Sequence, residues 1–135
     1  TGILTTTDLT EQFGRLGEPF LLIGEIENRL RVFIDGKFSL QELEKVRNPN
    51  DPDRQIESVL DLTFGEYAWL LQDPDGWSKC KLPIDRKVFC AHLDNVRMIR
   101  NDVMHFDTED VGPEAMNDLR LFAKLLEKLG ALSLR

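Results

Sequence analysis

The sequence has little that could span a membrane, build a disulfide framework or hold a metal. Its 135 residues include two cysteines and two histidines, and Cys80 and Cys90 are not spaced as a CxxC pair. No apolar run approaches the roughly 20 residues of a membrane helix, and no signal-peptide pattern is present. We therefore expect a cytoplasmic protein with free, partly buried thiols, no metal and no membrane contact.

Positive charge is also in short supply. The formal net charge is −7, which argues against a protein that binds DNA or other nucleic acid without specificity. The charge is uneven, however, because the segment from Lys79 to His105 has six basic and three acidic residues. This segment is the only locally basic part of the chain, although chance on a charged helical surface would also account for it.

Segments that alternate apolar and polar residues are scarce, and only residues 2–5 resemble a strand. Apolar residues recur instead at helical spacing. We expect Gly14 and Gly17 to break the first helix, Gly36 and Gly130 to end helices, and Asp73–Gly76 to form a turn. The sequence therefore predicts an all-α helical bundle, with helices from Thr7 or Asp8 to Phe13, from Pro19 to Ile34, and over 39–46, 55–60, 63–71, 84–105 and 113–129.

Two of these helices begin with a capping box. Ser39 is followed three residues later by Glu42, and Thr63 is followed by Glu66. In such a box the hydroxyl and the carboxylate each accept a hydrogen bond from the backbone N–H of the other residue. Between them, residues 47–53 form a polar, proline-broken loop that lacks the glycine and terminal glutamate of a calcium loop.

The stretch VRMIRNDVMHF, residues 96–106, places several polar residues at the end of an amphipathic helix. Arg100 falls on the apolar stripe, where a guanidinium needs an anion or a partner subunit. His105 lies five residues on, about 140° further round the helix, whereas Asn101 and His105 share a face. Arginine for phosphate and histidine for proton transfer could together cleave RNA without a metal. Alternatively, Arg100 pairs with a buried carboxylate and His105 is a cation at a helix C-terminus.

Other residues point less clearly to chemistry. His92 has no cysteine or carboxylate at metal-ligand spacing. Trp69 and Trp77 are expected in the core or packed against loops rather than as a platform for stacking bases.

The segment from Arg100 to His105 resembles the signature of the HEPN superfamily (higher eukaryotes and prokaryotes nucleotide-binding domains). That signature is an arginine, four to six residues, then a histidine, with a polar residue such as Asn101 after the arginine. The context is similar too, because LTFGEY at Leu62–Tyr67 precedes the helix and another helix follows it. The resemblance covers about residues 20–129.

This resemblance implies a small helical bundle that forms a homodimer, with arginine and histidine of both subunits along one cleft. Active HEPN domains are metal-independent ribonucleases, often of toxin or defence type. By this resemblance His105 would assist proton transfer at the ribose 2′-hydroxyl, Arg100 would stabilise the charged phosphate, and Asn101 would support them. The product would end in a 2′,3′-cyclic phosphate. Other HEPN domains are non-catalytic dimerisation or nucleotide-binding modules, and this alternative stays open.

A second resemblance concerns residues 2–9, GILTTTDL, which look like the last strand-to-helix element of a CBS domain. Thr5 and Asp8 match the positions that hold ribose and phosphate in CBS pairs that sense adenine nucleotides. A strand stub followed by Asp8 as a helix cap is an equal alternative. The resemblance implies residues 1–18 as the end of a CBS domain with a connecting helix and 19–135 as the HEPN-like domain of a longer prokaryotic protein. One CBS edge cannot bind nucleotide, so no cofactor is expected in this chain.

Overall fold

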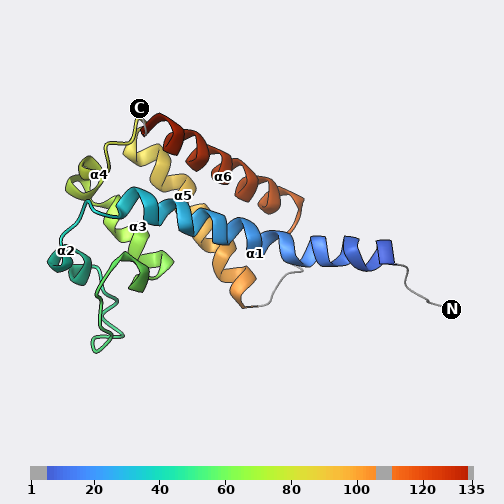
Figure 1. Ribbon diagram of the computed structural model, residues 1–135, viewed down its shortest axis with the longest axis horizontal. Helices are drawn as coiled ribbons and strands as arrows, with labels where there is room; N and C mark the ends of the chain where they lie inside the picture. Colours follow the sequence, from blue (N-terminus) through green and yellow to red (C-terminus); the bar gives the residue numbers. More distant parts are fainter. Residues whose placement is uncertain (1–5, 106–110, 134–135) are drawn as a thin grey trace.

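The computed structural model describes residues 6–105 and 111–133, and the side chains of 17–105 and 111–132 (Figure 1). Within these ranges the chain is helical and contains no strand, which confirms the predicted all-α class. The predicted strand at 2–5 and most of the loop predicted at 106–112 lie outside them. The elements are α1 (Thr6–Ile34), α2 (Leu40–Lys45), the 3-10 helix η1 (Val59–Asp61), α3 (Phe64–Gln72), α4 (Pro74–Cys80), α5 (Arg86–Met104) and α6 (Pro113–Ser133).

The long helices form the body of the molecule. Helix α6 lies along α1, and α5 packs against both of them and against α3, while α2 and α4 lie at one end (Figure 1). The first turns of α1 extend beyond the other helices. One continuous core joins these elements, with apolar stripes from the longer helices and single residues such as Leu43 of α2 and Cys80 of α4. Its largest fully buried apolar side chains are Ile23, Ile26, Leu30, Ile34, Phe64, Tyr67, Leu71, Phe89, Leu93, Leu119 and Leu126.

Helix α1 corrects the prediction that glycines break the first helix and that Pro19 begins a second one. The helix runs without interruption from Thr6 to Ile34, with Pro19 inside it and buried. An interior proline costs a helix about 3 kcal/mol and a glycine about 1 kcal/mol. The apolar face that α1 buries against α6 outweighs such costs. The predicted boundary between residues 18 and 19 therefore falls within a helix, and the two-part organisation stays a prediction.

Two further predictions, one of a turn and one of a helix end, were wrong. Asp73–Gly76 was expected to be a turn, but Asp73 caps α4 by accepting a hydrogen bond from the Gly76 N–H at 3.1 Å, with Pro74 as the first helical residue. Gly130 was expected to end the last helix, yet α6 continues to Ser133. Gly130 instead lies inside the helix beside the Phe33 ring of α1.

Both predicted capping boxes are present. Ser39 and Glu42 exchange hydrogen bonds at the start of α2, and Thr63 and Glu66 do so at the start of α3. The predicted helical turn over 55–60 is instead the 3-10 helix η1, which Ser58 caps. Among the described residues, no helix has the length and apolar character needed to cross a membrane.

Candidate functional site

Helix α5 carries the residues predicted to form the site. Asp85 caps its start by accepting a hydrogen bond from the Val88 N–H at 3.2 Å. Its buried face holds Phe89, Leu93, Val96, Ile99 and Val103. Ile99, rather than Arg100, fills the fourth position of this face. Arg100 therefore lies at the edge of the apolar stripe, where its charged end can reach solvent.

Arg100 forms a long ion pair that has no hydrogen bond. Its Nε atom lies 3.5 Å from Oε1 of Glu27 on α1, and the two side chains are 30% and 19% exposed. That Nε is buried and has no hydrogen-bond partner within the described part of the chain. Its Nη1 lies 3.5 Å from Oδ1 of Asn101, at the limit of a hydrogen bond. The guanidinium thus has an acidic neighbour without the short paired bonds of a tight salt bridge.

Glu27 is shared with a second arginine. Nη2 of Arg31 lies 3.6 Å from its Oε2, and Arg31 Nε donates a hydrogen bond to the Tyr67 hydroxyl at 2.7 Å. The Tyr67 hydroxyl donates in turn to the Val59 carbonyl oxygen at 2.9 Å. Burial raises the pKa of Tyr67 although Arg31 opposes that effect, so the phenol stays protonated as a donor. Glu27 is therefore the shared anion of two arginines, Arg31 of its own helix and Arg100 of α5.

His105 ends α5 as its C-terminal cap. Its backbone N–H donates to the Asn101 carbonyl oxygen at 3.1 Å, and its side chain is exposed. Within the described residues the imidazole has no hydrogen-bond partner. The predicted trio therefore shares one end of a helix, but the side chain of Asn101 contacts Arg100 rather than the imidazole of His105. A single chain does not join Arg100 and His105 in one pair.

The basic segment 79–105 is partly neutralised in the fold. Lys79 pairs with Glu42, Arg97 with Asp94 at 2.8 Å, and Arg100 with Glu27. In the described ranges, Lys81 and Lys87 have no carboxylate within 4.0 Å. The segment therefore does not offer six unpaired cations to a phosphate backbone.

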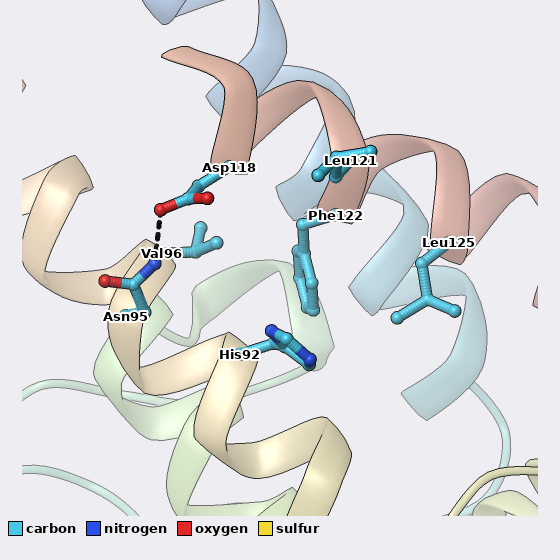
Figure 2. A pocket seen from close by; sticks show the side chains of 7 residues that line it. All are labelled: His92, Asn95, Val96, Asp118, Leu121, Phe122 and Leu125. Carbon is cyan, nitrogen blue, oxygen red and sulfur yellow. Dashed lines mark hydrogen bonds between the residues drawn. The ribbon is translucent and has the colours of Figure 1, made fainter. Parts of the chain in front are cut away.

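His92 lines a small pocket between α5 and α6 (Figure 2). Its ring faces Phe122 across the pocket, and beside it Asn95 Nδ2 donates to Asp118 Oδ2 at 3.1 Å. A volume of about 150 Å³ is below the usual range for ligand pockets. No group of three or more metal-binding side chains occurs in the part of the chain that the structure describes.

One of the two tryptophans lies outside the core where it was expected. Trp77 packs on Phe89 with ring centroids 5.0 Å apart, as expected of a packing residue, but Trp69 is 46% exposed. Trp69 lines a cleft between α2 and the α3–α4 pair. The helical spacing of α3 contained the signal, because Trp69 lies about 200° round the helix from both Tyr67 and Leu71. Both residues belong to the buried face of α3, and each is fully buried.

The free thiols agree with expectation, since Cys80 is buried and Cys90 is partly buried. Burial raises the pKa of Cys80 to about 11, so its thiol is not a reactive thiolate at neutral pH. Comparison with models of protein families, with curated proteins and with solved structures finds no match for this chain.

Proposed function

We propose that this helical domain is a metal-independent endoribonuclease that works as a homodimer, with Arg100 and His105 of both copies along one cleft. The observation that supports the proposal most is the state of Arg100. Its guanidinium is partly exposed and its carboxylate partner, Glu27, is 3.5 Å away without a hydrogen bond. Such a guanidinium can exchange the carboxylate for a phosphate oxygen, with which it forms shorter and stronger bonds.

Each side chain has a distinct task in this proposal. His105, exposed at the end of α5, takes the proton of a ribose 2′-hydroxyl as that oxygen attacks the adjacent phosphorus. Arg100 stabilises the negative charge that builds on the phosphate oxygens. Asn101, which touches Arg100, supports its orientation. The bond between phosphorus and the 5′-oxygen breaks, the imidazolium of His105 returns its proton to that oxygen, and a 2′,3′-cyclic phosphate remains. Regulation by adenine nucleotide would come from an upstream CBS pair.

A second candidate function comes from a different class: a non-catalytic module for dimerisation or nucleotide binding. The contact between Arg100 and Glu27 favours it, because this pair joins α5 to α1 within one chain. The exposed His105 side chain, with no partner in the described residues, favours it as well. In this module Arg100 is a structural residue and His105 has no chemical task.

One assay separates the two functions. The purified protein is incubated with a mixed RNA pool in EDTA, and we expect cleavage that leaves 2′,3′-cyclic phosphate ends. His105→Ala and Arg100→Ala should each lower the rate at least 100-fold. General acid–base catalysis by one side chain and electrostatic stabilisation of the transition state by one donor each contribute about that factor. The measurement is the initial rate by gel and the end chemistry by mass spectrometry.

The chain supplies matched controls on the same helix. His92→Ala removes the other histidine and Arg97→Ala a half-buried arginine that pairs with Asp94, and both variants should keep the wild-type rate. Equal losses in His92→Ala and His105→Ala would contradict the assigned roles. A folded, dimeric wild type that leaves RNA intact, with and without adenine nucleotides on the full-length protein, would favour the non-catalytic module.

A further inference from the structure

A cleft far from Arg100 and His105 has the size of a ligand site. It lies between α2 and the α3–α4 pair and has a volume of about 570 Å³, within the ~300–1,000 Å³ usual for small-molecule pockets. Phe38, Val46, Trp69 and Leu70 give it an apolar lining. Helix α4 lies near the start of α5, whereas His105 lies at the other end of α5 (Figure 1). At 1.5 Å per residue that helix is roughly 27 Å long.

Trp69 is the residue in this cleft that most needs a partner. It is the largest kind of side chain, and nearly half of it is in contact with solvent. Asp73 lies four residues further on, and both side chains line the cleft together with Asp75. A tryptophan ring attracts cations through its negative face, and adjacent carboxylates strengthen that attraction.

The same cleft already holds one cation in this way. The Lys79 ammonium lies 5.4 Å from the centre of the Phe38 ring and pairs with the Glu42 carboxylate. This pairing lowers the pKa of Glu42 to about 2, so that carboxylate stays charged. The other aromatic and acidic set, Trp69 with Asp73 and Asp75, has no such cation in the described part of the chain. The cleft therefore holds one lysine between a ring and a carboxylate, and its lining also includes a second ring, Trp69, and two carboxylates that pair with no cation in the described residues.

We propose that this cleft binds an aliphatic polyamine, a linear cation whose ammonium groups are separated by methylene chains. One ammonium group lies over Trp69 between Asp73 and Asp75, and the methylenes cover the apolar lining beside Leu70. The net charge of −7 attracts such a ligand to the protein. Lys45, which also lines the cleft and has no acidic partner in the described ranges, opposes binding. This proposal is independent of the ribonuclease function.

The test is an NMR titration of the ¹⁵N-labelled protein with spermidine, and with AMP as an anionic aromatic comparison. Two indole N–H signals are available, and Trp69→Phe assigns them. We expect spermidine to shift the Trp69 signal and to leave the Trp77 signal in place. Trp69→Ala should weaken binding about fivefold or more, and Lys45→Gln should tighten it about threefold.

A matched pair of variants separates the site from general attraction to an acidic protein. Asp75→Asn and Asp102→Asn remove the same charge from exposed positions, one in the cleft and one near the far end of α5. We expect Asp75→Asn to weaken spermidine binding about threefold and Asp102→Asn to leave it unchanged. Equal effects of the two variants would overturn the proposal. Binding of AMP that Lys45→Gln weakens, with no response to spermidine, would overturn it in favour of an anionic aromatic ligand.

Discussion

Replacing Glu66 with alanine is expected to cost about 3 kcal/mol of the free energy of unfolding. Glu66 is 1% exposed, and its carboxylate accepts hydrogen bonds from the backbone N–H groups of Thr63 at 2.8 Å and Asn48 at 2.6 Å, and from Arg54. Three donors would lose their acceptor at once, and Arg54 would lose its buried counter-charge. Urea unfolding followed by circular dichroism measures the loss.

Two variants test the cause of that loss. Glu66→Gln keeps the size of the side chain but turns an amide NH₂ toward a donor, so we expect about 2 kcal/mol of destabilisation. Glu44→Ala removes an exposed glutamate on α2 and should change stability by less than about 0.5 kcal/mol. If Glu66→Ala lowered the free energy of unfolding as little as Glu44→Ala, the Glu66 carboxylate would not be the group that holds residues 47–63 against α3.

Glu66 should also make stability depend on pH. Burial tends to raise its pKa, but the hydrogen bonds from Arg54, Thr63 and Asn48 outweigh burial, and the pKa lies below the usual value of 4.5. A carboxyl with a lowered pKa contributes its full stability above the unfolded-state pKa of about 4.3 and loses it as pH falls through the folded-state value. The stability difference between wild type and Glu66→Gln should therefore shrink below about pH 4. A difference that stays constant from pH 7 to pH 3 would contradict this.

Gly76→Ala is the second substitution with a large expected effect, about 2 kcal/mol or more of destabilisation. Gly76 is buried in α4, and a methyl group there would overlap the carbonyl oxygen of Leu70 and lie 3.4 Å from the Phe38 ring. Because the nearest obstacle is backbone, α4 would have to move away from α3. Thermal unfolding should show a fall of about 3 °C per kcal/mol for a chain of this size.

Gly24→Ala is the matched control. Gly24 lies inside α1, and a methyl group there would meet nothing within 4 Å. We expect this substitution to raise stability by about 0.5–1 kcal/mol, because alanine loses less backbone entropy in a helix. If Gly76→Ala and Gly24→Ala were both more stable than the wild type, α4 and α3 would not be in tight contact at Gly76.

The fold was predictable where local signals decide it. The capping boxes at Ser39 and Thr63 need only residues three positions apart, and both are present. Helix α1 was not predictable in the same way, since its continuity through Pro19 depends on packing against α6, about 100 residues later. Gly130 failed as a stop signal for the same reason, because the Phe33 ring beside it belongs to another helix.

The candidate site was predictable only as positions on one helix. The sequence placed Arg100, Asn101 and His105 at the end of α5, and the structure agrees. It could not supply Glu27, because that partner lies 73 positions away on α1. The same holds for Glu66. Its capping role was predictable, but its hydrogen bonds to Asn48 and Arg54 were not, because these residues lie 18 and 12 positions away in the sequence.

The neighbours α1 and α6 are the first and last helices of the described chain, and Glu18 and Arg120, 102 positions apart, join them at 2.7 Å. This arrangement affects how the chain folds while it is being synthesised. During synthesis Ile23, Ile26 and Leu30 leave the ribosome well before α6, the helix along which α1 packs. Until α6 has left the exit tunnel, the apolar face of α1 has only part of its cover, and the nascent chain is exposed to aggregation and to capture by chaperones.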